Sequence, residues 1–147
     1  MSKKVKIILA ITTTLVIVIL FLLNSENENI DFVKKENKKQ EDLFLKGENL
    51  FRKNECNACH YIGMNLVSTA PALGGITKRR KKDWLYRYTK MSLEMHEEGD
   101  SIAAEIRKKG WGAMPSYPKL TNEQLDAIYF FVEKRYEMTL KGIPVKR

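Results

Sequence analysis

The sequence has few of the residues that form disulfides, bind metals or interrupt helices and strands. Of its 147 residues, two are cysteine, two are histidine and four are proline. Two cysteines that stand three positions apart cannot cross-link a fold of this size, which excludes a disulfide scaffold. No segment alternates apolar and polar residues with a period of two, and no internal repeat is visible. The sequence therefore predicts an all-α fold.

Positive charge is in excess but unevenly distributed. The chain has 26 Lys and Arg against 18 Asp and Glu, a formal charge of +8. Residues 56–147 contribute +6 of this, with sixteen basic and ten acidic side chains. Such a surplus favours an acidic partner or surface. The sequence has no motif that binds nucleic acid. We therefore expect redox partner proteins with acidic docking surfaces and no nucleic acid.

The longest uncharged run lies near the N-terminus. Three lysines precede Ile7–Leu23, which has seventeen uncharged residues, and a membrane-spanning helix needs about 17–25. The lysines predict a cytoplasmic N-terminus, with the remainder across the membrane. A cleaved signal peptide is the alternative, but no A-x-A-like cleavage site follows the run. We therefore expect an uncleaved single-pass anchor over residues 1–24 in the inner (cytoplasmic) membrane.

The rest of the chain divides into a linker and a helical domain. Residues 25–40 are polar and charged, which predicts a flexible linker. In residues 41–147 apolar side chains recur at spacings of three and four, which predicts a domain of about four to five helices on the periplasmic, extracytoplasmic side. The expected helices are one from Glu41 to the CNACH motif, one over Asp83–Met91, one between an Asp100 cap and Gly110, and one that begins with a capping box of Thr121 and Gln124.

Residues 56–60, CNACH, contain both cysteines and one of the two histidines. A redox-active Cys-x-x-Cys normally follows a strand, and none is expected here. A structural zinc site needs four ligands, and only His96 remains to complete one. Cys-x-x-Cys-His is the attachment signature of c-type haem, in which Cys56 and Cys59 bond the porphyrin and His60 ligates the iron. We therefore predict one covalently bound haem c.

The sequence resembles class I c-type cytochromes over about residues 41–147. The matching stretches are GENLFRKNECNACH (47–60), APALGGI (70–76) and GAMPSYPKLTNEQLDAIYFFV (112–132). The resemblance implies helices around one haem, with the first and last helices crossing near Gly47 and Phe51. It also implies that the carbonyl of Pro71 accepts a hydrogen bond from His60, which would fix the imidazole ring.

A second axial ligand must come from a segment distant from His60. The possible donors are Met64, Met91, Met95, Met114, Met138 and His96. Neighbouring glycines and prolines keep Met114 out of a helix, so that its thioether can enter from a loop, and the resemblance places the ligand at the same Met-Pro dipeptide. We predict that His60 and Met114 are the metal ligands. His96, which lies among acidic residues, is expected to be exposed.

Two further features have open interpretations. Trp84, counted here with the cofactor-binding residues, and Tyr88 lie at helical spacing and either reach the haem propionates or fill the core. The basic run Lys78–Lys82, KRRKK, is either a docking patch or a solvated charged stretch.

A haem iron that protein ligates on both sides has no open position for a substrate and exchanges single electrons. We therefore predict that the chain is not an enzyme but a membrane-anchored monohaem electron carrier of a respiratory chain. The alternative is a permanently bound haem c subunit of a membrane oxidoreductase of the nitric oxide reductase or terminal oxidase type. A haem-based sensor or a peroxidase would need an open sixth position.

Overall fold

The structure is a computed structural model that describes residues 2–145, except for the side chains of residues 4–14 and 21–29. Within these residues every regular element is helical, which confirms the all-α prediction. Contacts divide the chain into two compact units, residues 1–41 and 42–147. The elements are α1 (Lys3–Lys53), the 3-10 helix η1 (Cys56–Ala58), α2 (Ile76–Arg79), α3 (Lys82–Glu97), α4 (Ser101–Lys108) and α5 (Asn122–Leu140).

The N-terminal part of the predicted fold class is wrong. In the part of the chain that the structure describes, no helix combines the length and the hydrophobicity that a membrane span requires. Of the stretch Ile7–Leu23, the described side chains are those of residues 15–20. The side chains of residues 7–14 and 21–23 lie outside those described.

Residues 25–40, predicted to be a flexible linker, are helical and belong to α1. Lysine, glutamate and glutamine are strong helix formers, and they make up six of the residues from 30 to 40. Lys39 also lies one turn from Glu36, with its Nζ 3.9 Å from Oε2. Intrinsic helix propensity therefore explains why a segment without an apolar face is helical here.

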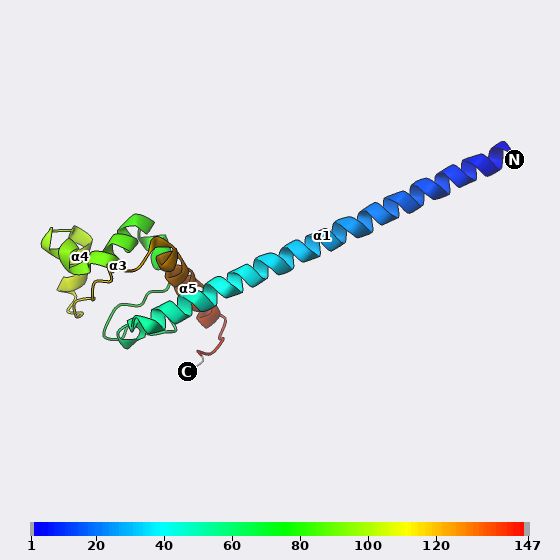
Figure 1. Cartoon of the computed structure of the whole chain (residues 1–147). Helices are drawn as coiled ribbons and strands as arrows, with labels where there is room; N and C mark the ends of the chain where they lie inside the picture. Colours follow the sequence, from blue (N-terminus) through cyan, green and yellow to red (C-terminus); the bar gives the residue numbers. More distant parts are fainter. Residues whose placement is uncertain (1, 146–147) are drawn as a thin grey trace. The chain divides into compact units, whose positions relative to one another are not determined.

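The core of the second unit forms where the last turns of α1 cross α5, as Figure 1 shows. Gly47 makes this crossing close, because a Cβ atom at this position would lie 2.0 Å from the carbonyl oxygen of Ala127. Beside it, the fully buried rings of Phe51 and Phe131 pack with centroids 5.5 Å apart. The structure thus contains the crossing near Gly47 and Phe51 that the family resemblance implies.

Short-range signals place the ends of two helices. The Asp100 side chain accepts hydrogen bonds from the backbone N–H groups of Ile102 and Ala103 and so caps α4. Thr121 and Gln124 form the predicted capping box at the start of α5. Both caps confirm the sequence prediction.

Helix α3 is longer than the predicted Asp83–Met91. Its backbone leaves helical geometry at Met91 (φ −146°, ψ 44°) and then continues as helix to Glu97. Ser92 and Met95 in this continuation are buried, so tertiary packing carries the helix past the break. The predicted end of the helix is therefore a kink within α3.

Candidate functional site

The CNACH segment follows directly after α1. Glu55, with a left-handed backbone (φ 56°), ends the helix and begins the turn η1. The backbone N–H of His60 donates to the Cys56 carbonyl across 2.9 Å, which closes this turn. Both thiols are free in the described structure, with Cys56 half-buried and Cys59 exposed. The turn thus presents two thiols and an imidazole from one short stretch of backbone.

His60 is buried and held by one hydrogen bond. Its side chain is 8% exposed, and its Nδ1 lies 2.9 Å from the carbonyl oxygen of Pro71. The backbone N–H of Ala70 also donates to the Cys59 carbonyl (3.2 Å), which ties the segment of Pro71 to the motif. Since a carbonyl oxygen only accepts, Nδ1 carries the proton and Nε2 has the lone pair that an iron ligand needs.

The titration of these groups fits ligation and attachment rather than thiol redox catalysis. Burial lowers the pKa of His60, and the hydrogen bond to the Pro71 carbonyl acts in the opposite direction. Burial raises the pKa of the Cys56 thiol to about 11. A reactive redox thiol has a lowered pKa, because the thiolate is the nucleophile. Cys56 is therefore protonated at neutral pH, unlike the attacking cysteine of a redox motif.

A zinc site is not formed. Among the residues that the structure describes, no three His, Cys, Asp or Glu side chains come together as ligands of one metal ion. His96, the remaining histidine, lies on α3 and is not grouped with the cysteines or His60. The donor set of the motif, two thiols and a neutral imidazole, fits a covalently held haem.

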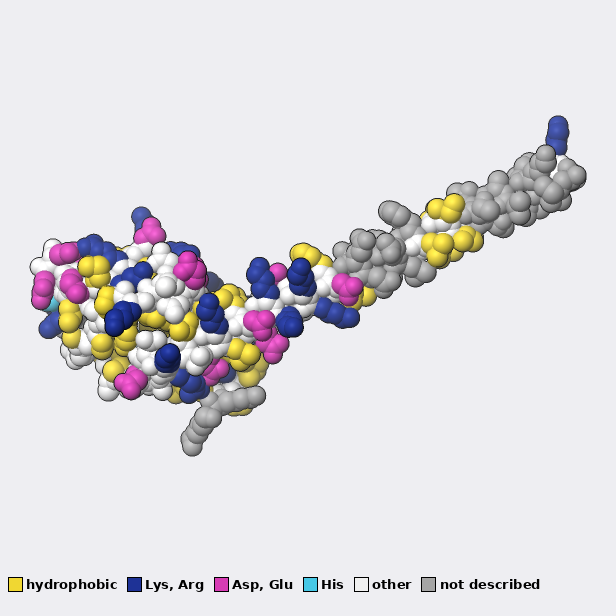
Figure 2. All heavy atoms as spheres, in the orientation of Figure 1, with side chains coloured by type: hydrophobic (Ala, Val, Ile, Leu, Met, Phe, Trp, Pro, Cys, Tyr) yellow, Lys and Arg dark blue, Asp and Glu magenta, His cyan; other side chains and the backbone are white. Residues whose placement is uncertain are grey.

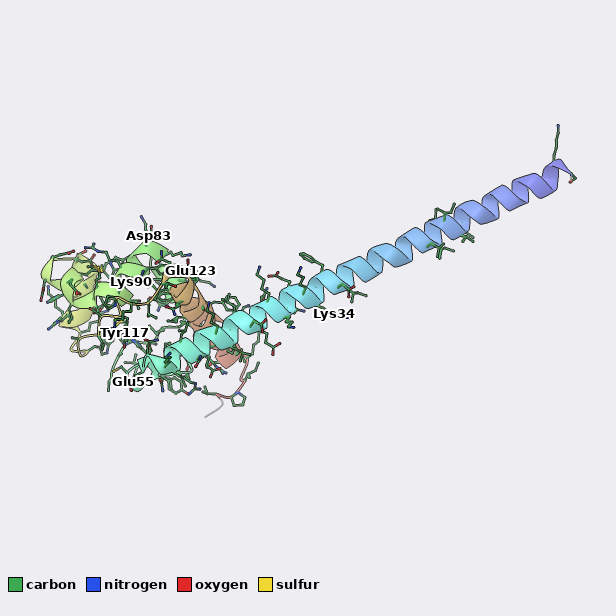
Figure 3. The ribbon with its side chains drawn as sticks, viewed as in Figure 1. Lys34, Glu55, Asp83, Lys90, Tyr117 and Glu123 are labelled. Carbon is green, nitrogen blue, oxygen red and sulfur yellow. The ribbon has the colours of Figure 1, made fainter. Side chains whose placement is uncertain are left out.

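Met114 lies in an irregular segment between α4 and α5. Its carbonyl accepts a hydrogen bond from the Ser92 hydroxyl on α3, and the N–H of Tyr117 donates to the Thr89 carbonyl (3.0 Å). In Figure 3, Tyr117 is labelled near Glu55, and its hydroxyl donates to the Asn54 carbonyl at the end of α1 (3.1 Å). The loop that carries Met114 is thus joined both to α3 and to the segment before CNACH.

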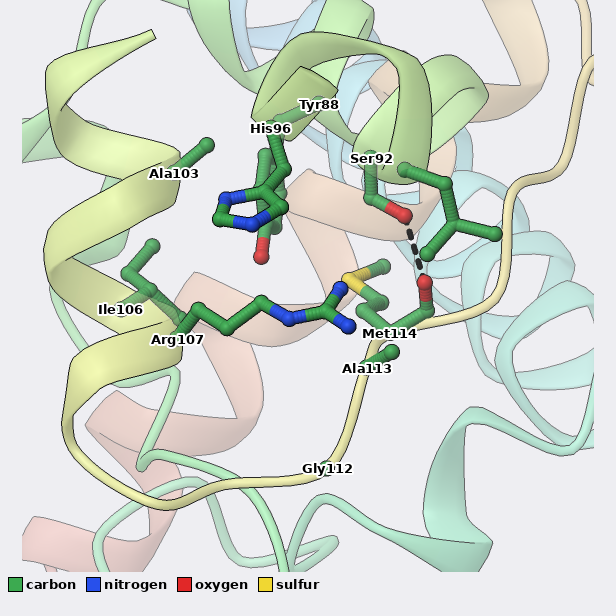
Figure 4. A pocket seen from close by; sticks show the side chains of 10 residues that line it. Tyr88, Ser92, His96, Ala103, Ile106, Arg107, Gly112, Ala113 and Met114 are labelled. Carbon is green, nitrogen blue, oxygen red and sulfur yellow. Dashed lines mark hydrogen bonds between the residues drawn. The ribbon is translucent and has the colours of Figure 1, made fainter. Parts of the chain in front are cut away.

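A cavity of about 10 Å³ lies between this loop, α3 and α4. Figure 4 shows Met114 from the loop and His96 from α3 directed toward it, with Tyr88 and Arg107 beside them. His96 is half-buried rather than exposed, so that prediction is wrong. Its acidic neighbours were misleading, whereas the four-residue spacing of Tyr88, Ser92 and His96, which line the same cavity, would have indicated a shared face.

The remaining possible ligands lie elsewhere. Met64 and Met95 are fully buried, Met64 in the main core. Met91 is 38% exposed at the break of α3. Met138 is half-buried on the last turns of α5. Of the six donors considered from the sequence, Met114 and His96 are the two that line the cavity.

Trp84 contacts two other side chains. Its indole Nε1–H donates to both carboxylate oxygens of Asp100, at 3.2 and 3.1 Å. Its ring stacks on Tyr88 with centroids 4.8 Å apart. Because this N–H is the only donor of the indole, Asp100 uses the whole hydrogen-bonding capacity of the Trp84 ring.

Comparisons with known proteins identify the family of this chain. The family model for cytochrome c matches residues 44–135, a range that contains the CNACH motif, Pro71 and Met114. A cytochrome c from Rhodothermus marinus is 25% identical, with a TM-score of 0.55 over 65% of this chain and 78% of that chain. An engineered cytochrome c from the same organism, bound to a carbene intermediate, is 26% identical, with a TM-score of 0.52 over 65% and 79%. A comparison with curated protein sequences gave no match.

The family match covers more than half of the chain and includes every residue of the motif. Cytochrome c domains bind haem c covalently, normally one group in a monohaem domain. The chain therefore belongs to the cytochrome c family of haem-based electron carriers, with covalently bound haem c as its cofactor.

Proposed function

We propose that this protein carries single electrons in a respiratory chain on the extracytoplasmic side, with one haem held by Cys56, Cys59, His60 and Met114. The observation that carries the proposal is the buried imidazole of His60, whose Nδ1 is bonded to the Pro71 carbonyl (2.9 Å) beside two free thiols. Cytochrome c domains are often extracytoplasmic, and covalent attachment of haem suits that compartment.

Each residue has a defined part in this proposal. Cys56 and Cys59 would hold the porphyrin by two thioether bonds, so that the group could not dissociate. Pro71 keeps Nδ1 of His60 protonated, which leaves Nε2 as the ligand and fixes the ring orientation. The thioether of Met114 would be the second protein ligand of the iron, and thioether ligation would raise the reduction potential. The bound haem then supplies a reversible one-electron couple with no open position for a substrate.

The basic run also supports a proposal about the partner. Within Lys78–Lys82, the Arg79 guanidinium donates to the Gly74 carbonyl (2.6 Å), and Lys82 pairs with Asp126 (2.6 Å). Lys78 and Lys81 are exposed. On the face that Figure 2 shows, Lys and Arg side chains are spread among acidic and apolar ones. We therefore propose that Lys78 and Lys81 give the local positive charge for docking to an acidic redox partner.

The full chain with its haem tests the carrier function directly. A redox titration should follow a one-electron curve, the ferric spectrum should contain the long-wavelength band of iron ligated by a thioether, and the ferrous protein should not bind carbon monoxide. Met114→Ala should abolish the band and lower the potential. Met138→Ala, which removes a half-buried methionine outside the cavity, is the matched control. Rapid carbon monoxide binding by the unmodified protein would instead indicate a sensor or a peroxidase.

A further inference from the structure

A hollow of about 320 Å³ lies between α2, α3 and α5. Its apolar part is made by four side chains and two cations line it as well: Leu85, Tyr86, Tyr129 and Phe130, with Arg80 and Lys82. This volume lies within the range of about 300–1,000 Å³ that is usual for binding pockets. The lining contains no residue of CNACH, and neither Pro71 nor Met114, so the hollow is separate from the proposed haem site.

Bonds between the three helices hold the walls of the hollow in place. Lys82 on α3 pairs with Asp126 on α5, with Nζ 2.6 Å from Oδ1, and the Tyr86 hydroxyl donates to the same carboxylate. Glu133 on α5 accepts hydrogen bonds from the backbone N–H and the hydroxyl of Thr77 on α2, at 2.9 and 2.8 Å. A hollow whose walls are already fixed binds an occupant at a lower entropic cost than one that must form on binding.

The apolar part of the hollow is largely aromatic. The rings of Tyr86 and Tyr129 stack with centroids 5.9 Å apart and an angle of 13° between their planes. Phe130, which is half-buried, adds a third ring. Large apolar side chains that enter such pockets supply most of the binding energy of a protein interface. The hollow is therefore suited to an apolar side chain of another molecule.

Positive charge surrounds this apolar part. Residues 78–83 carry five positive charges and one negative charge. Among the residues that the structure describes, Lys78, Arg80 and Lys81 form no salt bridge. The Arg80 guanidinium donates one hydrogen bond, from Nη1 to the neighbouring Arg79 carbonyl (3.1 Å). The two carboxylates of the lining are already bonded within the domain, so the charge around the hollow favours an acidic occupant.

We propose that the hollow receives an apolar side chain of an acidic partner protein, whose flanking carboxylates pair with Arg80, Lys78 and Lys81. This inference rests on the docking part of the proposed function and names the place and the chemistry of the contact. The charges increase the rate of encounter. The inserted side chain then fixes the position of the partner, because only one place on this surface accepts it.

The probe is a pentapeptide, blocked at both ends, with one phenylalanine between two pairs of aspartates. It is titrated into the full haem-loaded chain, and the chemical shifts of the backbone amides report both the site and the Kd. A second peptide has alanine in place of the phenylalanine, and a third has lysines in place of the aspartates. This comparison on the unmodified protein needs no variant to fold.

Two substitutions test the two halves of the contact. Phe130→Ala removes part of the apolar wall, and Arg80→Gln removes one positive charge. The matched controls are Leu140→Ala and Lys141→Gln, since both residues are exposed at the end of α5 and lie outside the lining. Thermal unfolding checks that each variant is folded.

The phenylalanine peptide should shift the amides of the residues that line the hollow. Its Kd should rise about fivefold or more with Phe130→Ala and up to about fivefold with Arg80→Gln, and should stay unchanged in both controls. The alanine peptide should bind about fivefold or more weakly than the phenylalanine peptide. The lysine peptide should cause no shifts at the hollow.

Equal affinities for the phenylalanine and alanine peptides, or shifts confined to the amides around Cys59, would overturn the hollow as the docking site. Shifts of the lining amides that depend on protein concentration without peptide would overturn it too, in favour of a second copy of this chain as the occupant. The proposed carrier function fails in the redox titration and the ferric spectrum, which do not involve the peptides. The two failures are therefore distinguishable.

Discussion

Replacement of Gly47 by alanine tests the packing that brings the haem-binding segment into position. A Cβ atom there would lie 2.0 Å from the Ala127 carbonyl oxygen and 2.7 Å from the Cβ of Phe131. Both neighbours belong to α5, and the nearer atom is backbone, so that no side-chain rotation relieves the contact. The two helices must move apart to accommodate the methyl group, which also loosens the packing of Phe51 on Phe131.

Two opposing effects set the magnitude. Overpacking a close-packed core destabilises by typically about 1–3 kcal/mol and occasionally more, and a contact this short with backbone belongs at the upper end. Alanine is a better helix former than glycine by about 1 kcal/mol. We therefore expect Gly47→Ala to lower the free energy of unfolding by about 2 kcal/mol or more. For a domain near this size that corresponds to a fall of roughly 8–16 °C in Tm.

Urea and thermal unfolding of the haem-loaded protein, followed by haem absorbance and tryptophan fluorescence, measure this change. Asn49→Ala is the matched control, because Asn49 is exposed on the same helix and the substitution gains helix propensity without entering the core. It should leave the protein as stable or slightly more stable, by at most about 0.7 kcal/mol. If Gly47→Ala behaves like the control, the close crossing of α1 and α5 does not exist and the reasoning fails.

Three further substitutions test the attachment, the docking and a helix cap. Cys56→Ala or Cys59→Ala should leave at most one thioether bond and poor maturation, and covalent haem in a protein that lacks both thiols would contradict the attachment. Lys78→Gln with Lys81→Gln should flatten the fall of the electron-transfer rate with ionic strength, whereas an unchanged salt profile would mean a solvated stretch. Asp100→Ala should destabilise by about 0.5–2 kcal/mol at neutral pH. Hydrogen bonds from Ala103 and Trp84 lower the pKa of Asp100, so the difference should vanish as pH falls through that lowered pKa, and a difference constant down to strong acid would contradict the cap.

Local patterns predicted well only what depends on a few neighbouring residues. The caps at Asp100 and Thr121 follow from side chains that bond backbone N–H groups two or three positions away. Polarity alone does not exclude helix in residues 25–40, which belong to α1, because lysine and glutamate are good helix formers. Local patterns did not predict the end of α3, because Ser92 and Met95 are buried and Ser92 bonds the Met114 carbonyl, 22 positions along the chain.

The sequence by itself determined the chemistry of this protein, since the two cysteines and the histidine of CNACH lie within five consecutive residues. Only the tertiary structure decided how that chemistry is held. The bond from His60 to Pro71 spans eleven positions, and the indole donor of Trp84 is bound by Asp100, sixteen positions away. His96 and Met114 share a cavity because α3 and the loop pack together. Contacts between residues so far apart in the sequence depend on how whole helices and loops pack together, and no local spacing of residues specifies them.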